Sequence, residues 1–324
     1  MSVEAGLKTK NVIYVGAIEG FEAAKEVLAD IAAVQNIPAS TVEISKALEC
    51  ADAMLDASMK VKITDQMILS APRLRIISCA TTGSDHIQRG TLNERGIPVR
   101  TLKEDAELLR NITPAAELSW ALLMACARRL LAATRHVIEG GWNRELFPGI
   151  MLNGKCLGLI GCGRIGGWMA RYGHAFGMDV IGYDPHLSQW PDTIRQVSLV
   201  KLMETSDFVS IHVHLNPETE GLVSRHLIER IKPSAVVINT SRGAIIDQEA
   251  LLAGLRSGRI YGVGLDVITG EPDIAGHPLV EFARKNDNVL ITPHCGGFSP
   301  DAVRVVCAHA AEKIRTVLVD ETDR

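Results

Sequence analysis

The sequence of 324 residues has few aromatic side chains, no closely spaced cysteine pair and no long apolar run. Phe, Trp and Tyr together make up 4% of it. No stretch of about 18 uncharged apolar residues occurs, so we expect no membrane span. The seven cysteines are scattered and none forms a C-x-x-C pair. This pattern is typical of neither a disulfide framework nor a zinc site, and we predict no bound metal.

An excess of positive charge is also missing. The formal net charge is −4, from 34 basic and 38 acidic residues, so we expect no nucleic-acid partner. The N-terminus, MSVEAGLKTKNVIYVG, lacks the layout of a signal peptide. With 47% hydrophobic and 22% charged residues, the chain has the composition of a soluble globular protein. We predict a reduced, cytoplasmic protein.

Apolar runs that alternate with helical stretches are what the sequence does contain. This order predicts βαβ units and the α/β class, with parallel strands buried on both faces. We predict two doubly wound Rossmann-like domains with parallel sheets and a cleft between them. Residues 1–103 with 296–324 would form a substrate-binding domain, and residues 104–295 a dinucleotide-binding domain.

The predicted strands are short and apolar. They are Val12–Val15, Ala53–Leu55, Leu74–Ser78, Ile97–Val99, Cys156–Ile160, Asp179–Tyr183, Phe208–Val213, Ala235–Asn239, Ile260–Leu265 and Val289–Ile291. Helical segments are predicted near Phe21–Ala33, Thr64–Leu69, Pro114–Ile138 and Ser299–Val319. Pro114 at the start and Gly140-Gly141 past the end are the expected boundaries of one long helix.

A glycine-rich turn follows the strand that ends at Ile160. Gly161, Gly163 and Gly166 form G-x-G-x-x-G, between an apolar strand and a helical stretch. In this context the first glycine makes the turn, the second lets the backbone approach a pyrophosphate, and the third packs helix against strand. Asp184 ends the next strand, where a carboxylate binds ribose hydroxyls and repels a 2′-phosphate. We therefore predict NAD rather than NADP.

With these residues placed, the chain resembles the D-isomer-specific 2-hydroxyacid dehydrogenase family, most closely its phosphoglycerate-dehydrogenase-like branch. The motifs that carry the resemblance are Ala80-Thr81-Thr82-Gly83-Ser84-Asp85, Asn111-Ile112-Thr113-Pro114-Ala115-Ala116-Glu117, Leu152-Asn153-Gly154-Lys155 before the glycine turn, Asn239-Thr240-Ser241-Arg242-Gly243, Leu265-Asp266-Val267-Ile268-Thr269-Gly270-Glu271-Pro272 and Thr292-Pro293-His294-Cys295-Gly296-Gly297.

The resemblance implies an NAD-dependent oxidoreductase that reduces a small 2-oxo acid of the phosphoglycerate, hydroxypyruvate or glyoxylate kind. It implies that Arg242, Glu271 and His294 are catalytic. The residues expected to bind cofactor are Gly161, Gly163, Arg164, Ile165, Gly166, Asp184, Val213, Thr240, Ser241, Asp266, Gly296 and Gly297. Those expected to bind substrate are Thr82, Gly83, Ser84, Arg242 and His294.

The chemistry of these residue types fits hydride transfer. His294 can exchange a proton with the carbonyl oxygen, since imidazole titrates near working pH. Glu271, if hydrogen-bonded to it, would favour imidazolium and fix the ring. Arg242 presents a charged planar fork that can hold carboxylate and carbonyl together. The Thr82–Ser84 turn could offer backbone N–H groups to the substrate carboxylate, and Asp266 could bind the nicotinamide amide.

Two positions depart from the family pattern. A Thr-Pro pair is common where this chain has Val213 and His214, so His214 is either a solvated loop residue or a substrate contact. In the phosphoglycerate branch an Arg aligns with Ser58, so Lys60 or Lys62 would have to bind a phosphate.

Two alternatives share the fold. A dehydrogenase-like corepressor that senses NADH would carry the same Arg, Glu and His, but such proteins usually have long terminal extensions. Formate dehydrogenases of the superfamily lack the Glu partner of the histidine, so Glu271 speaks against formate oxidation. Finally, apolar residues at helical spacing in Pro114–Ile138, with Trp120 and Trp142 nearby, predict a homodimer built on the dinucleotide domain. The alternative is that this segment is a helix that packs between the two domains.

Overall fold

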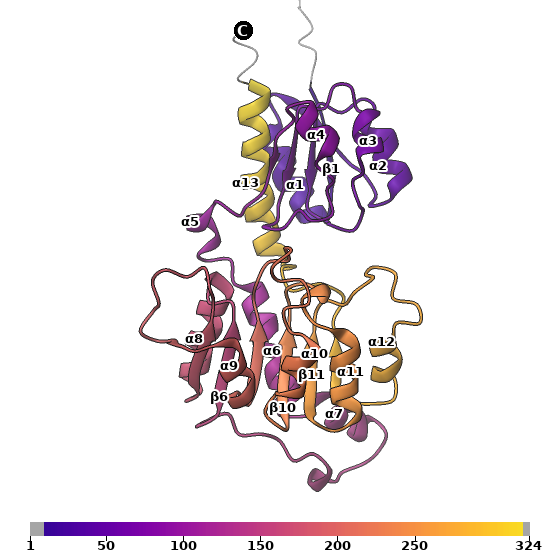
Figure 1. Cartoon of the computed structure of the whole chain (residues 1–324). Helices are drawn as coiled ribbons and strands as arrows, with labels where there is room; N and C mark the ends of the chain where they lie inside the picture. The colour runs from indigo at the N-terminus through magenta and orange to yellow at the C-terminus, as the bar shows by residue number, and fades with distance from the viewer. Residues whose placement is uncertain (1–9, 320–324) are drawn as a thin grey trace, which may run out of the picture. The chain divides into compact units, whose positions relative to one another are not determined.

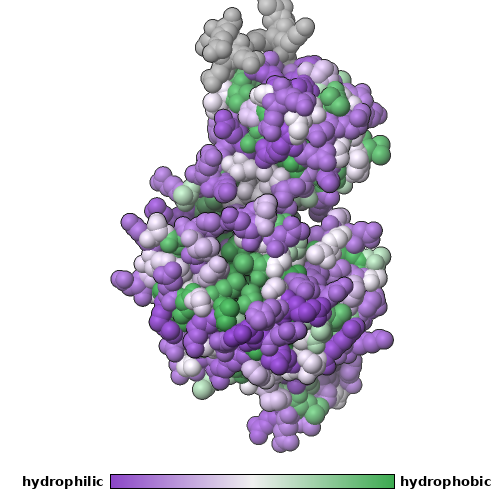
Figure 2. All heavy atoms as spheres, in the orientation of Figure 1, coloured by the Kyte–Doolittle hydropathy of each residue, from purple (hydrophilic) through white to green (hydrophobic). Residues whose placement is uncertain are grey.

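The computed structural model describes residues 10–319, and the chain divides into two compact units (Figure 1). The split unit comprises Met1–Ile112 and Phe298–Arg324, and the central unit comprises Thr113–Gly297. The N-terminal stretch in which we expect no signal peptide begins in residues 1–9, outside the described residues. No helix within residues 10–319 is both long and apolar enough to cross a membrane. Figure 2 shows a mostly hydrophilic surface, with apolar side chains gathered on the visible face of the central unit.

The split unit is built on a five-stranded parallel sheet. Its strands lie in the order β2-β1-β3-β4-β5, with the chain reversing direction along the sheet between β1 and β3. Ligands of such sheets bind at the carboxyl ends of the strands, near the reversal. The strands are β1 (Lys10–Val15), β2 (Ala32–Asn36), β3 (Ala53–Asp56), β4 (Ile76–Cys79) and β5 (Val99–Arg100).

Helices cover both faces of this sheet. One core cluster joins it to α1 and α13, and Figure 1 shows the yellow C-terminal helix beside the indigo N-terminal elements. A second cluster joins the other face to α2, α3 and α4. The helices are α1 (Ile18–Leu28), α2 (Thr41–Leu48), α3 (Asp65–Leu69), α4 (Gly90–Glu94), α5 (Ala106–Leu109) and α13 (Pro300–Val319).

The central unit holds a seven-stranded parallel sheet in the order β12-β11-β10-β9-β6-β7-β8. The direction reverses between β6 and β9, which places the expected ligand crevice at the carboxyl ends of these two strands. The strands are β6 (Cys156–Ile160), β7 (Asp179–Tyr183), β8 (Arg195–Gln196), β9 (Phe208–Ile211), β10 (Ala235–Asn239), β11 (Ile260–Leu265) and β12 (Val289–Ile291).

Two layers of helices sandwich the seven strands. One core cluster contains residues of α6 and α8, and the cluster on the other face contains residues of α9 to α12. The helices are α6 (Pro114–Ala127), α7 (Leu130–Ile138), α8 (Arg164–Ala175), α9 (Leu199–Thr205), α10 (Arg225–Glu229), α11 (Gln248–Arg256) and α12 (Pro278–Ala283), with the short turns η1 (Arg144–Leu146) and η2 (Gly243–Ile245).

The predicted α/β class with two parallel sheets is confirmed. Several local predictions are wrong. The helix predicted near Phe21–Ala33 ends at Leu28, because Ala32–Asn36 pairs with β1 as the edge strand β2. The strand predicted to reach Val213 ends at Ile211. Neither α2 nor the two-residue strand β8 was predicted from the sequence.

The single long helix predicted over Pro114–Ile138 is also wrong. The chain forms α6 and α7, separated at Arg129, whose φ is +52°. The carbonyl of Ala127 accepts a hydrogen bond from the N–H of Ile150, at 2.8 Å, rather than continuing the helix. The Arg129 guanidinium donates to the carbonyl of Leu146, at 2.9 Å. Tertiary contacts with the returning chain therefore end the helix where no Pro or Gly marks it.

Candidate active site

The glycine turn lies at the carboxyl end of β6, beside the reversal point of the sheet. Gly161 has φ +90°, and a Cβ there would lie 2.6 Å from the carbonyl oxygen of His212. A Cβ on Gly166 would lie 2.2 Å from the carbonyl oxygen of Gly161. Both positions therefore exclude larger residues, while the space over Gly163 is open. Gly163 caps α8, whose first N–H groups can receive an anion.

Asp184 connects this turn to the end of β7. Its Oδ2 accepts a hydrogen bond from the N–H of Cys162 and its Oδ1 from the N–H of His186, both at 3.0 Å. Each carboxylate oxygen has a second acceptor position that a ribose hydroxyl could use. Next to it, the exposed His186 and Glu218 form an ion pair of 3.2 Å. Arg164 and Ile165, at the start of α8, are half-buried, and burial lowers the pKa of Arg164.

The residues after β9 and β10 lie on the other side of the turn. Ser241 Oγ donates to the carbonyl of Ile211, at 2.9 Å, and so ties the two strand ends together. Thr240 Oγ1 lies 2.7 Å from Ser119 Oγ on α6. A Cβ on Gly161 would lie 2.8 Å from Val213 Cγ1, so Val213 packs against the turn. His214 is exposed.

His212 is a residue of this edge that sequence reasoning did not single out. Its Nε2 lies 2.8 Å from Ser210 Oγ, and its buried Nδ1 has no partner within residues 10–319. Burial lowers the pKa of His212 to about 3, so the ring is neutral at physiological pH. The available signal was its position directly after a buried strand, at the reversal point of the sheet.

The predicted contact between His294 and Glu271 is present in the structure. His294 Nδ1 lies 2.9 Å from Glu271 Oε1, with 36% and 29% of the two side chains exposed. His294 Nε2 has no hydrogen-bond partner in the part of the chain that the structure describes. The backbone N–H of His294 donates to the carbonyl of Asp266, at 2.9 Å, and its φ is +52°. The turn thus holds the ring with one nitrogen oriented by a carboxylate and the other available.

Asp266 fixes the turn that carries His294. The residue is 1% exposed, and its carboxylate accepts bonds from the N–H groups of Cys295 and Gly296, at 2.9 and 2.7 Å. Thr292 Oγ1 donates to it as well, at 2.5 Å. A Cβ on Gly296 would lie 2.9 Å from this carboxylate, while Gly297 has open space around it. The contact between Asp266 and the nicotinamide amide stays a prediction; its contacts within the protein position the histidine turn.

Arg242 follows β10, Glu271 follows β11 and His294 follows β12, and these three strands are neighbours in the sheet. The three residues therefore follow the carboxyl ends of adjacent parallel strands. The buried Asn239 donates to the carbonyl of Arg242, at 2.9 Å, and Arg242 Nη1 donates to the carbonyl of Ser241, at 2.8 Å. A Cβ on Gly243 would lie 2.3 Å from the backbone of Ile268. The Arg242 turn therefore packs closely against the segment that leads to Glu271.

The predicted carboxylate-binding loop, Thr82–Ser84, belongs to the split unit and follows β4. Within residues 10–319, its three backbone N–H groups have no hydrogen-bond acceptor. Thr81 Oγ1 donates to the carbonyl of Gly83, at 2.7 Å, and so holds the loop tight. His86, directly after it, forms a buried pair with Asp56 at 2.6 Å, a contact that the sequence did not predict. Three unpaired, adjacent donors suit an anion.

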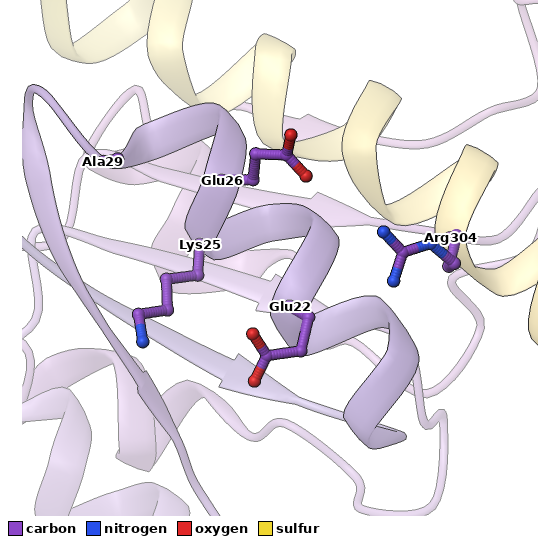
Figure 3. Close-up of a pocket in the computed structure, with 5 residues that line it drawn as sticks. All are labelled: Glu22, Lys25, Glu26, Ala29 and Arg304. Carbon is purple, nitrogen blue, oxygen red and sulfur yellow. The ribbon is translucent and has the colours of Figure 1, made fainter.

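Two hollows in the surface lie apart from these residues. One lies between α1 and α13, where Arg304 points toward the charged face of α1 (Figure 3). Its walls come from Glu22, Lys25, Glu26, Ala29 and Arg304. The other lies at the amino end of β11 and is lined by Cys126, Arg129, Tyr261, Gly262, Lys285, Asn286, Asp287 and Asn288. Neither hollow is lined by a residue predicted for the site. The predicted site residues lie instead at or after the carboxyl ends of the strands.

The chain is similar to several known proteins. The family model described as D-isomer specific 2-hydroxyacid dehydrogenase, NAD binding domain, matches residues 120–296. This match confirms the predicted cofactor class. The chain is 38% identical to hydroxypyruvate reductase of Thermotoga maritima, over 78% of this chain and 80% of the relative. It is 36% identical to glyoxylate reductase of Korarchaeum cryptofilum, over 86% and 82%.

A longer relative is also similar. The chain is 35% identical to D-3-phosphoglycerate dehydrogenase of Methanocaldococcus jannaschii, over 86% of this chain but 52% of the relative, so it spans about half of that protein. Among solved structures, a protein from Thermus thermophilus matches with a TM-score of 0.84 and 32% identity, covering 95% and 96% of the two chains. D-lactate dehydrogenase of Aquifex aeolicus, solved with NAD and lactic acid, matches with a TM-score of 0.82 and 25% identity, covering 97% of each.

Proposed function

The chain belongs to the D-isomer-specific 2-hydroxyacid dehydrogenase family, and from this premise we propose that it reversibly reduces a small 2-oxo acid with NADH. The observation that carries the proposal is the His294–Glu271 pair, which lies on the same sheet edge as the glycine turn. An oriented imidazole near a dinucleotide-binding turn is what carbonyl reduction requires. The names of the relatives support substrates of the phosphoglycerate, hydroxypyruvate or glyoxylate kind.

In this proposal the glycine turn and Asp184 would hold NADH at the reversal point of the central sheet. When bound there, the cofactor would supply the hydride that the carbonyl carbon of the substrate accepts. His294 Nε2 gives a proton to the carbonyl oxygen, so that the ketone becomes an alcohol and the imidazole becomes neutral. Glu271 holds Nδ1 and compensates the imidazolium charge before transfer. A proton from solvent restores the histidine, and the reverse steps oxidise the alcohol.

Two further groups hold the substrate. Arg242 binds the substrate through charged hydrogen bonds and polarises its carbonyl. The unpaired N–H groups of Thr82–Ser84 receive the carboxylate. We assign NAD binding to the central unit and carboxylate binding to the split unit.

We further propose a homodimer. Several large apolar side chains between residues 130 and 151 are exposed, most of all Trp142 at 90% and Ile138 at 80%. A single chain leaves these side chains in water, and burial against a second copy would remove them from it.

The function is tested by NADH absorbance with glyoxylate, hydroxypyruvate, pyruvate and phosphohydroxypyruvate. We expect turnover of at least one of them.

His294→Ala should lose on the order of a hundredfold or more in kcat while NADH still binds. Glu271→Gln should lose less, because the imidazole remains. Arg242→Ala should damage both kcat and KM, since it serves binding and polarisation together.

The matched control is His226→Ala, an exposed histidine on α10. It should leave all constants unchanged. A His294→Ala enzyme with near-normal kcat would show that the proton donor is another residue, and NADH oxidation with none of the acids would overturn the proposed function.

A further inference from the structure

Arg89 stands at the start of α4, in a backbone position that its neighbours fix. The carboxylate of Asp65 accepts the N–H of Thr91, at 2.7 Å, and the side chain of Gln88 accepts the N–H of Asp65, at 2.8 Å. A Cβ on Gly90 would lie 2.9 Å from the Asp65 carboxylate, so α3 and α4 are in close contact here. This packing holds the Cα of Arg89 in place and leaves its side chain to reach the adjacent loop.

The guanidinium of Arg89 reaches the predicted carboxylate-binding loop. Its Nη2 donates to Ser84 Oγ, at 2.7 Å, and both side chains are half-buried. A serine hydroxyl that accepts from an arginine still has its own O–H to donate. The same charge is felt at the end of β4: burial raises the pKa of Cys79 to about 12 and the charge of Arg89 acts in the opposite direction. Arg89 therefore lies at the carboxyl end of the split unit's sheet.

The charge of Arg89 is not neutralised by any carboxylate of the described residues. Within residues 10–319 no carboxylate lies within ion-pair distance of it, and Ser84 is its one hydrogen-bond partner. The carboxylate at the end of the adjacent β3, Asp56, is already bound by His86 and Ser58. An arginine whose remaining donors have no protein acceptor suits a ligand anion.

Two more cations follow β3, the strand next to β4. Lys60 and Lys62 are exposed, and neither is within ion-pair distance of a carboxylate in the described residues. Arg89, Lys60 and Lys62 thus follow the carboxyl ends of two adjacent strands, and none of them is paired with a carboxylate of the described residues. This positive charge lies in a chain whose net charge is −4. The distribution favours a ligand with more negative charge than one carboxylate.

We propose that Arg89 forms a cationic subsite that selects 2-oxo acids with a second anionic group, a phosphate or a carboxylate. The inference rests on the proposed function and adds a substrate class to it. The Thr82–Ser84 N–H groups hold the carboxylate common to all 2-oxo acids. Arg89, assisted by Lys60 and Lys62, binds the second anion. In this chain the guanidinium belongs to Arg89, at the start of α4. Ser58, which follows β3, carries no charge.

The test compares kcat/KM with NADH for phosphohydroxypyruvate, oxaloacetate and the uncharged-side-chain acid hydroxypyruvate. Wild type should prefer one of the two acids that carry a second anionic group, and the preferred one identifies this group as phosphate or carboxylate. In Arg89→Leu, the ratio of kcat/KM for that acid to kcat/KM for hydroxypyruvate should fall about tenfold to a hundredfold, as for loss of a charged hydrogen bond, mainly through KM. Arg89→Lys should keep part of the ratio, because the charge remains.

Lys46→Leu, an exposed cation on α2, is the matched control and should leave the ratio unchanged. Circular dichroism and NADH binding establish that the Arg89 variants are folded. Two outcomes overturn the inference while the proposed function stands: a wild-type preference for hydroxypyruvate, or equal losses for all three acids in Arg89→Leu. Failure of wild type to reduce these three acids would overturn this inference, and the proposed function would fall with it only if glyoxylate and pyruvate were not reduced with NADH either.

Discussion

Asp184 fixes the glycine turn at the end of β7, and we propose that it also binds the ribose of the cofactor, so a single substitution would disturb both. Its carboxylate accepts the N–H of Cys162 and so fixes the glycine turn, whose Gly161 has no room for a side chain. The remaining acceptor positions are available to ribose hydroxyls. A 2′-phosphate would be repelled by the Asp184 carboxylate, so the end of β7 favours NADH over NADPH.

We expect wild type to use NADH with at least tenfold higher kcat/KM than NADPH, a difference of about 1.4 kcal/mol or more. Asp184→Ser should raise the KM for NADH and narrow the gap, because the ribose contact is lost and repulsion is relieved. Asp192→Ser, an exposed acid of the same unit, should change neither constant. Initial rates with both cofactors check this. Equal efficiency of the wild type with NADH and NADPH would contradict the prediction.

At the residue scale, contacts between residues of recognisable motifs could be predicted from the sequence. Contacts that depend on how distant segments pack in the folded chain could not. The His294–Glu271 contact follows from motifs 23 positions apart, and the structure forms it. The three bonds from Thr292, Cys295 and Gly296 to Asp266 depend on how a buried carboxylate meets a turn, which no spacing encodes. The same holds for His212, whose ring is neutral and whose Nδ1 is buried.

At the scale of elements, the buried central strands were predictable, whereas the edge strands β2 and β8 were not. Cys156–Ile160 and Ala235–Asn239 are fully apolar or nearly so because both faces are covered, and their bounds were predicted to the residue. The edge strand β2 has polar residues and one covered side, so its sequence, AAVQN, continued a helical pattern. The break between α6 and α7 depends on Ile150, 23 residues beyond Ala127, and local propensity holds no sign of it.

The C-terminal helix α13 is tied to the segment after β5 by charge as well as packing. Lys313 bonds to the carboxylate of Asp105 and to the carbonyl of Thr101, and His309 lies 3.0 Å from the same carboxylate. Burial raises the pKa of Asp105, but hydrogen bonds from Lys313 and His309 outweigh it, and the pKa is lowered overall. A lowered folded pKa means that folding favours the charged carboxylate.

Asp105→Asn should therefore destabilise the protein at pH 7 by about 1.5–3 kcal/mol, the range for hydrogen bonds to charged groups. The contribution is complete above the ordinary Asp value of 3.8 and is lost as the pH falls through the lower folded pKa. Urea unfolding midpoints of wild type and variant should thus converge in acid. Glu104→Gln, an exposed neighbour, is the control. A difference that persists unchanged below pH 3.8 would mean that the effect is not electrostatic.

At the scale of the whole molecule, exposed apolar area is concentrated in one stretch of the central unit. Leu130, Val137, Ile138, Trp142, Leu146 and Met151 are each at least half exposed. Buried side chains of the preceding α6 belong to the core under the sheet, so α6 cannot turn to cover this stretch. Stable homodimers bury roughly 1,200–2,000 Å² or more in total, and a contiguous run of such residues on two copies is suited to supply it.

We expect the wild type to have twice the mass of its 35.1 kDa chain in light scattering at micromolar concentration. A double variant, Ile138→Ser with Trp142→Ser, should shift the mass toward one chain, because these two side chains are the most exposed and would lose most from truncation at a buried interface. Val42→Ser, 73% exposed on α2 of the split unit, removes a comparable apolar group outside the stretch and should leave the mass unchanged. Activity with NADH, measured on the same samples, separates loss of assembly from loss of folding. A monomeric wild type would refute the dimer. A double variant that stays dimeric would place the interface on another surface, since neither side chain could then be at its centre.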